Sequence, residues 1–186
     1  MTEEAEEYLE RAGLDEGRRK KLVELGYADA PASIRHHLSR PGGLAEHSAN
    51  VTRRLLALTD AFGIKWKRPE SPYLVGMLHD VCKALTYRRS YEGEWAYRHS
   101  GIPGHGLQSA SVVMSALGIQ LTSQELYSIT WHMGAFRLEK DGLAEYDAAL
   151  NVYPLEIIAT HTADMLASRI DERERPKDGR EGGKGR

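Results

Sequence analysis

The sequence predicts an all-α protein, a single helical bundle with one small β-hairpin insertion. Apolar residues recur at helical spacing in several segments, and Gly and Pro breaks separate these segments. The sequence shows neither an internal repeat nor an alternation of strand and helix patterns. Its 186 residues, 41% hydrophobic and 28% charged, match the size and composition of one globular domain.

The first 30 residues predict two helices that pack on the same domain as the rest of the chain. Residues 3–11 are charged and favour a helix. Asp15 is placed to cap a second helix that ends near Leu25. The basic run at 18–21 lies on this second helix, and we interpret it as a solvated face rather than a phosphate-binding patch.

Two longer helices follow, and each carries ionisable residues on the side that its apolar residues predict to face the core. The first is amphipathic and runs from Leu44 to Phe62, with His47 on the line of its core stripe. The second begins after Pro72, ends near Ala84 and carries His79, Asp80 and Lys83. Burying an unpaired carboxylate is costly, so we expect a cation beside Asp80. That cation is either Lys83, an arginine, or a metal ion held jointly with His79.

The second half of the chain predicts one hairpin, further helices and a disordered tail. The aromatic residues of Thr86–Tyr97 flank a Glu-Gly turn, which indicates a hairpin or an ordered loop. This segment either covers a site or packs its aromatic rings on the body. The other expected elements are helices at 107–117, 123–131 and 155–170, an irregular segment at 136–148, and a disordered tail at 171–186.

Bulk properties exclude several classes of protein. A formal charge of −2 gives no global field that would recruit nucleic acid, and a single cysteine excludes an internal disulfide or a thiolate zinc cluster. The acidic N-terminus is unlike a signal peptide, and no apolar run is long enough for a membrane span. No Gly-rich phosphate loop is present. We therefore expect a soluble cytoplasmic protein.

Several imidazoles and carboxylates lie at helix termini or on inward helix faces. Facing helices of a bundle can bring such side chains together into a metal centre. Nitrogen and oxygen ligands without thiolate suit Mn, Fe, Co, Ni or Zn better than Mg or Ca, and two such ions can promote phosphoryl transfer. The residues that would converge are His47, His79, Asp80, His105, His132 and Asp164.

The order of these residues resembles the HD-domain phosphohydrolase superfamily. The matching motifs extend over roughly residues 35–170. Their amino-acid sequences look most like those of the HD part of a bacterial exoribonuclease in which an OB-fold precedes the HD part. The motifs are Gly42-Gly43-Leu44-Ala45-Glu46-His47-Ser48, Leu78-His79-Asp80-Val81-Cys82-Lys83, Gly104-His105-Gly106, Trp131-His132-Met133 and Ala163-Asp164-Met165-Leu166-Ala167-Ser168.

The resemblance implies a role for each matching residue. Residues 31–170 would form the HD domain and bind two divalent transition-metal ions. Asp80 would bridge them, and a metal-bound hydroxide would attack phosphorus. Lys83 would bind a phosphate oxygen, which makes Asp80 and Lys83 the catalytic pair. The first ion would be held by His47, His79, Asp80 and Asp164, and the second by Asp80, His105 and His132.

Other polar residues near these motifs have weaker assignments. Many family members carry glycine where this chain has Cys82, which we interpret as an inert packing residue. We expect His161 to be a hydrogen-bond partner beside the site and His99 to belong to the loop surface. Four further residues are candidates for substrate-phosphate contacts, with surface charges or helix caps as the alternative: His36, His37, Arg40 and Arg137.

The resemblance implies a phosphodiesterase that acts on a nucleotide or a short oligonucleotide. Only about 35 residues precede the site and they appear helical, so there is no room for an OB-fold and no long nucleic-acid groove is expected. The alternatives are a nucleotide phosphomonoesterase or triphosphohydrolase, a di-iron oxygenase of the HD type, and a non-catalytic scaffold or sensor. The sequence does not indicate the oligomeric state.

Overall fold

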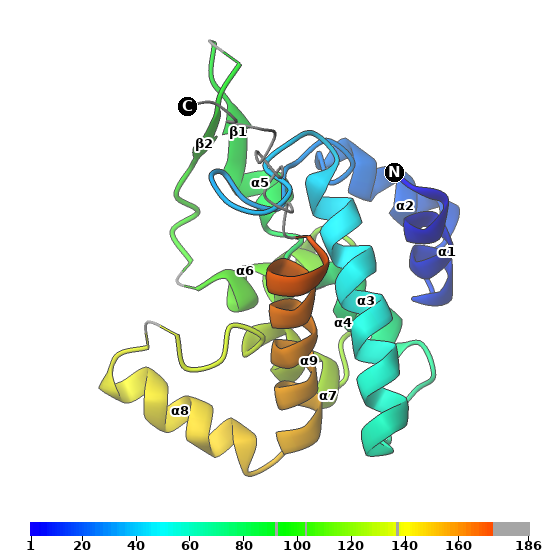
Figure 1. Cartoon of the computed structure of the whole chain (residues 1–186), viewed down its shortest axis with the longest axis vertical. Helices are drawn as coiled ribbons and strands as arrows, with labels where there is room; N and C mark the ends of the chain where they lie inside the picture. The colour runs from blue at the N-terminus through cyan, green and yellow to red at the C-terminus, as the bar shows by residue number, and fades with distance from the viewer. Residues whose placement is uncertain (92, 103, 137, 173–186) are drawn as a thin grey trace, which may run out of the picture.

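The computed structural model describes residues 1–91, 93–102, 104–136 and 138–172, and it confirms the all-α prediction with a small hairpin (Figure 1). The predicted tail at 173–186 lies outside the described residues. The elements are α1 Glu3–Arg11, α2 Glu16–Glu24, α3 Gly43–Phe62, α4 Ser71–Leu78, α5 Lys83–Thr86, β1 Tyr87–Arg89, β2 Trp95–Tyr97, α6 His105–Ser115, α7 Ser123–Thr130, α8 Lys140–Leu150, α9 Pro154–Leu166 and a π-helical turn Ala167–Asp171.

Helix α3 is the central element of the bundle. It packs along both α4 and α9, and α1 lies against α3 and α4 (Figure 1). Val51 and Leu55 of the α3 apolar stripe are fully buried in the core, and Leu58 is half-buried. The expectation that the stripe extends to Phe62 was wrong, because this last residue of the helix is 59% exposed. His47 lies on the same buried side of the helix, as its spacing predicted. The sequence of α3 therefore directs one imidazole into the interior.

The contact between α3 and α4 is close because α4 carries a glycine there. A Cβ atom on Gly76 would lie 2.7 Å from the Cα of Thr52 and would overlap the Thr52 side chain. Glycine thus lets the two backbones approach each other. This approach sets the distance between His47 on α3 and His79 at the end of α4.

The structure corrects the prediction of one continuous helix through His79 and Asp80. Helix α4 ends at Leu78, and the short α5 begins at Lys83. Between them the backbone makes hydrogen bonds between residues three apart, from Lys83 N to Asp80 O, for example. Such bonds tighten the turn relative to an α-helix. The His-Asp pair therefore lies in a compact turn between two helices.

The segment expected to be irregular contains helix α8. Only Ala149 of this helix is buried, and Gly142 lies within its first turn. Helix α8 extends from one side of the bundle and has no apolar stripe comparable to that of α3 (Figure 1). The expectation of irregular structure at 136–148 was wrong from residue 140 onward, because it relied on apolar spacing, which a largely exposed helix does not need.

The predicted hairpin is present and directly follows α5. Strands β1 and β2 are antiparallel, with Tyr87 opposite Tyr97 and Arg89 opposite Trp95. Tyr87 is buried against the body, whereas Tyr97 is 42% exposed and lies with its ring centroid 6.3 Å from that of His105. The hairpin therefore anchors one aromatic ring in the core and brings another beside a predicted ligand.

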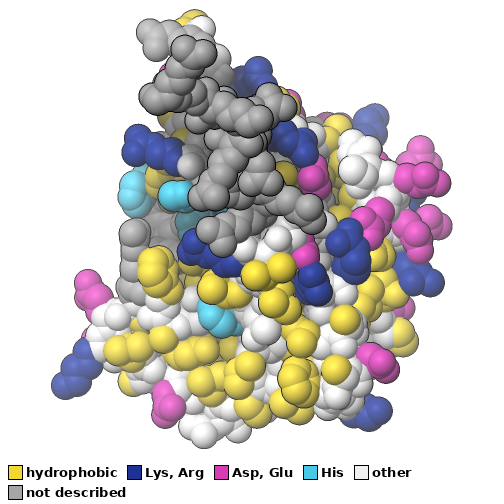
Figure 2. Space-filling model, viewed as in Figure 1, with side chains coloured by type: hydrophobic (Ala, Val, Ile, Leu, Met, Phe, Trp, Pro, Cys, Tyr) yellow, Lys and Arg dark blue, Asp and Glu magenta, His cyan; other side chains and the backbone are white. Residues whose placement is uncertain are grey.

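One face of the lower bundle carries many exposed apolar side chains. Figure 2 shows hydrophobic side chains gathered on the lower part of the face where Figure 1 places α8 and α9. The exposed large apolar residues of α8, α9 and the segment between them include Leu143, Val152, Leu155, Ile158 and Met165.

No helix within the described ranges is both long enough and apolar enough to cross a membrane.

Candidate metal centre

The predicted first-ion residues come together at one end of α3. The fully buried Nε2 of His47 lies 3.2 Å from Asp164 Oδ1 on α9 and 4.0 Å from Asp80 Oδ2. His79 Nε2 lies 3.5 Å from Asp80 Oδ2. Three separate elements thus place four polar side chains around one point.

The residues predicted for the second ion lie on the other side of Asp80. His132, just past the end of α7, has its Nε2 atom 3.5 Å from Asp80 Oδ1. His105 begins α6, and its Nδ1 atom lies 3.7 Å from Cys82 Sγ. Ligand atoms of Asp80, Cys82 and His105 lie within 4.8 Å of one another. The two oxygens of Asp80 thus face different groups of histidines.

Three of the histidines direct an Nε2 atom without a hydrogen-bond partner toward this space, and that of His47 also lies at ion-pair distance from Asp164. The Nδ1 atoms of His79 and His132 donate to the carbonyl oxygens of Gly76 and Ile129, at 2.9 and 2.8 Å. A carbonyl only accepts, so these rings carry their proton on Nδ1 and leave Nε2 with a lone pair. Within the described ranges, the buried atoms without a hydrogen-bond partner include Asp80 Oδ1 and four imidazole Nε2 atoms: those of His37, His47, His79 and His132.

Unpaired buried polar atoms are costly, and these are the atom types that bind transition metals. Ligand atoms that share an ion at about 2.1 Å lie roughly 3.0 to 3.4 Å apart. The separations of 3.2 and 3.5 Å between the imidazole nitrogens and the carboxylate oxygens are close to this range. The described His and Asp clusters therefore fit a metal centre.

The cation expected beside Asp80 is Lys83. Its Nζ atom lies 2.5 Å from Asp80 Oδ2 and also donates to the Ala32 carbonyl oxygen at 2.7 Å. Although burial opposes ionisation, the Lys83 ammonium holds the pKa of Asp80 well below its usual range. Burial likewise disfavours the ammonium, but Asp80 raises the pKa of Lys83. Both groups are therefore charged at neutral pH.

The histidines differ in pKa because their neighbours differ. Burial favours the neutral form of His47, but the carboxylates of Asp164 and Glu172 raise its pKa to about 9. Burial lowers the pKa of His79, and the nearby Asp80 only partly offsets this effect. The pKa of His132 is raised, because interaction with Asp80 outweighs its burial. His47 and His132 therefore bind a proton more tightly than His79 does.

A cavity of about 550 Å³ opens onto Asp80, Lys83 and Asp164. The predicted phosphate contacts His36 and His37 line it, together with Arg169. Its remaining wall is largely apolar. The apolar lining residues are Met133, Ala135, Phe136 and Met165.

The residues with weaker assignments have distinct environments. Arg40 pairs with Glu46 at 2.5 Å, and Arg137 lies outside the described residues. His161 donates from Nδ1 to the His132 carbonyl oxygen at 2.7 Å, which matches its expected supporting position. Burial raises the pKa of Cys82 to about 12, so its thiol is protonated at neutral pH.

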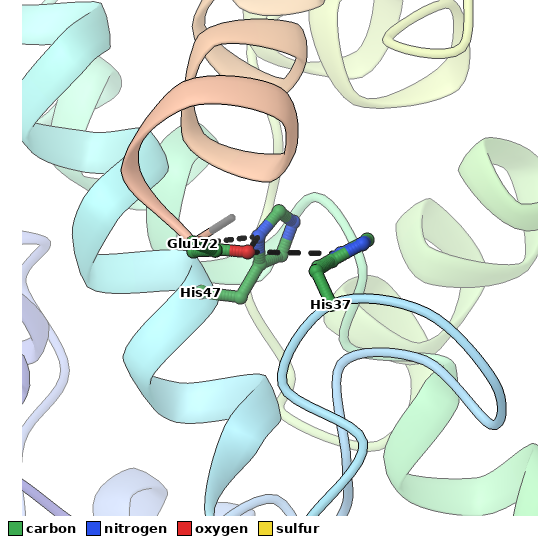
Figure 3. A group of neighbouring side chains, drawn as sticks. All are labelled: His37, His47 and Glu172. Carbon is green, nitrogen blue, oxygen red and sulfur yellow. Dashed lines mark hydrogen bonds and ion pairs between the residues drawn. The ribbon is translucent and has the colours of Figure 1, made fainter. Parts of the chain in front are cut away.

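Glu172 was not among the predicted site residues. The prediction placed it in the disordered tail, yet its side chain is 1% exposed and contacts His47 (Figure 3). His37 Nε2 lies 3.8 Å from the same carboxylate. A signal was present in the sequence, because Asp171 and Glu172 directly follow the last apolar residue of the final helical segment.

Comparison with known proteins gives one informative match. No protein-family model matches the chain, and neither does any solved structure. A curated protein of Methanocaldococcus jannaschii, dihydroneopterin 2',3'-cyclic phosphate phosphodiesterase, is 31% identical over 101 residues, covering 42% of this chain. The match spans 39% of the length of that relative. The chain therefore has a distant phosphodiesterase relative and buried His/Asp clusters suited to a metal.

Proposed function

We propose that this chain is an HD-type, metal-dependent phosphodiesterase. The observation that carries the proposal is the set of unpartnered Nε2 atoms facing the Asp80 and Asp164 carboxylates at a cavity, a statement confined to the described ranges. The similarity to a phosphodiesterase supports the same reaction class. We assign the catalytic domain to residues 31–170, with the N-terminal helices packed against it.

The proposed roles follow from the positions of the side chains. The Asp80 carboxylate would bridge two ions, because its Oδ2 faces His79 and its Oδ1 faces His132. His47 and Asp164 would complete one position, and His105 would contribute to the other. Bound divalent ions would lower the pKa of coordinated water and neutralise charge on phosphate oxygens.

Lys83 would serve two purposes in this arrangement. It keeps Asp80 ionised, and Lys83 is one of the residues that line the cavity where a substrate phosphate would bind. An ammonium has three protons, and the contacts to Asp80 and Ala32 use two of them. The third would donate to a phosphate oxygen. His37 is a second proposed phosphate contact, on the same cavity wall.

The cavity supports a small substrate. A volume of about 550 Å³ is within the usual range of small-molecule pockets. Its polar side would hold a phosphodiester and its apolar side a base-like ring, which suits a nucleotide or a short oligonucleotide. The relative is named for activity on a small cyclic phosphodiester, which is consistent with this class.

The decisive experiment compares hydrolysis of a generic phosphodiester with that of a generic phosphomonoester. Metal-stripped protein would be assayed with added Mn²⁺, and Asp80→Asn would serve as the variant because it keeps the size of the side chain. We expect diester turnover that requires Mn²⁺ and falls by at least about 100-fold in Asp80→Asn, since the proposed bridging carboxylate is lost.

The alternatives give different results in the same assay. Turnover of the monoester alone would replace the phosphodiesterase proposal with a nucleotidase. Absence of turnover together with two bound irons and oxygen consumption would favour a di-iron oxygenase. Absence of both activities and of any metal binding would favour a scaffold or sensor module.

A further inference from the structure

We infer that Glu172 is a positioning residue that holds the His47 ring in its metal-binding orientation. The inference rests on the proposed function, because it assumes that His47 is a metal ligand. Both carboxylate oxygens of Glu172 contact His47 Nδ1, at 2.9 and 3.1 Å (Figure 3). The Glu172 side chain is almost completely buried.

The geometry indicates that Glu172 supports the His47 ring and is not itself a ligand of the proposed ion. Glu172 contacts Nδ1, whereas Asp164 and Asp80 lie on the Nε2 side of the same ring. The carboxylate therefore lies behind the imidazole relative to the proposed ion. A ring that donates its Nδ1 proton to a carboxylate has its tautomer and orientation fixed, and its Nε2 atom becomes more basic.

His47 depends on tertiary structure in a way that the neighbouring histidines do not. His79 and His132 each donate from Nδ1 to a carbonyl oxygen three residues earlier in their own segments. The Nδ1 partner of His47 instead lies 125 residues away in sequence. Loss of Glu172 should therefore disturb the position held by His47 and leave the other rings supported.

The π-helical turn Ala167–Asp171 places Glu172 against α3. The Glu172 N–H donates to the Ala167 carbonyl oxygen five residues earlier at 3.0 Å. The neighbouring Asp171 forms a bidentate ion pair with Arg54, and Asn50 donates to Glu172 Oε1 at 2.9 Å. Two adjacent acids thus bind α3, but only Glu172 reaches a proposed ligand.

This difference provides a matched control. Asp171→Asn removes one negative charge from the same turn and breaks only the surface ion pair with Arg54. Glu172→Gln keeps the hydrogen-bond acceptor and the size of the side chain but removes its charge, whereas Glu172→Ala removes the contact. All three variants would be compared with wild type by circular dichroism and thermal unfolding, so that only folded proteins enter the binding measurements.

The test measures metal binding without substrate. Metal-stripped proteins would be titrated with Zn²⁺ in competition with a chelator, and with Co²⁺, whose visible absorption reports coordination geometry. We expect the Kd of one ion to rise roughly 10- to 100-fold in Glu172→Ala, with a smaller rise in Glu172→Gln and an altered Co²⁺ spectrum. Asp171→Asn should retain the wild-type Kd and spectrum.

Several results would overturn the inference. If Glu172→Ala and Asp171→Asn raised the Kd for metal equally, the turn would only attach the end of the last described helix to α3, and Glu172 would have no specific effect on His47. An additional ion lost in Glu172→Gln would make Glu172 a ligand, with His37 and His47 as its partners. A wild-type protein that binds metal but hydrolyses no phosphoester would overturn the proposed function alone, and this result would leave the role of Glu172 intact.

Discussion

At the scale of single residues, the buried polar side chains at the proposed centre include several that are stabilised by partners of opposite charge or by backbone carbonyls. Lys83 offsets the cost of burying Asp80, and carbonyl oxygens hold the rings of His79 and His132. In the described residues, the buried side-chain atoms without a hydrogen-bond partner include Asp80 Oδ1 and the Nε2 atoms of His47, His79 and His132, and these four lie together at the site where we propose metal binding. The other such atoms belong to His37, Ser48, Gln108 and Ser128.

A second buried carboxylate, Glu125, has a structural role. Both oxygens of the fully buried Glu125 accept from Arg68, at 2.7 and 2.8 Å, and Ser71 donates to Oε1 at 2.7 Å. Glu125 also closes a capping box with Thr122 at the start of α7. Burial opposes ionisation here, but the hydrogen bonds from Arg68 hold the pKa of Glu125 below its usual 4.5.

This pair predicts a specific pH dependence of stability. Because the folded-state pKa is depressed, the contribution of Glu125 is complete above the unfolded-state pKa and is lost as pH falls through the folded-state value. Glu125→Gln should therefore reduce the free energy of unfolding by about 1–3 kcal/mol at neutral pH and by less in acid. Urea unfolding of metal-free protein at several pH values would measure the difference.

Glu24→Gln is the control for this prediction. It removes the same charge from an exposed pair with Lys21, at 3.6 Å, so its effect should stay below about 1 kcal/mol at every pH. A Glu125→Gln penalty that does not shrink in acid would contradict the proposed linkage.

At the scale of elements, the site depends on how closely α3 and α4 approach. The overlap between an added Cβ atom at Gly76 and Thr52 forces the helices apart in Gly76→Ala. We expect a loss of about 1–3 kcal/mol in the free energy of unfolding. Metal affinity should fall as well, since His47 and His79 would separate. Denaturant titration and metal competition would test the two effects.

Gly142→Ala is the control for Gly76→Ala, because α8 can accommodate an added Cβ atom at this position. The nearest atom to an added Cβ is on the Leu138 side chain at 3.4 Å, which is an ordinary contact. This variant should be stabilised by up to about 1 kcal/mol through helix propensity and should bind metal normally. Equal losses of metal affinity in both variants would contradict the packing argument.

At the scale of the whole molecule, the proposed ligands come from elements spread along most of the chain. They lie on α3, in the turn after α4, at the start of α6, just past α7 and on α9. An unfolded chain does not preserve this arrangement, so ion binding should favour the folded state. The centre would then connect segments that are distant in sequence.

Metal binding should therefore raise the thermal stability of the protein. At about 100 times the Kd, a ligand specific to the folded state adds roughly 2.7 kcal/mol. For a chain of this length we expect Tm to rise by about 5–10 °C. Differential scanning calorimetry with and without Mn²⁺ or Zn²⁺ would measure the shift, which should be much smaller in Asp80→Asn. An unchanged wild-type Tm with each ion would contradict a stable centre.

The local pattern of apolar, Gly and Pro residues in the sequence was sufficient to predict the all-α class, the hairpin and the buried face of α3. Apolar spacing and Gly or Pro breaks depend only on near neighbours in sequence, which explains their success for strongly amphipathic segments. The candidate ligands were also named from the sequence, through the order of motifs that resemble the HD superfamily. Their assignment as ligands stays a prediction until metal binding is measured.

Tertiary structure decided the features that depend on distant contacts. It broke the predicted helix at His79 and Asp80, formed α8 without an apolar stripe, and placed Glu172 against His47. Local spacing shows which face of a helix a residue occupies, but a contact across 125 residues depends on how the helices pack. The sequence therefore indicates the residues of a candidate centre, and the packing of α3 with the turn Ala167–Asp171 determines how His47 is oriented.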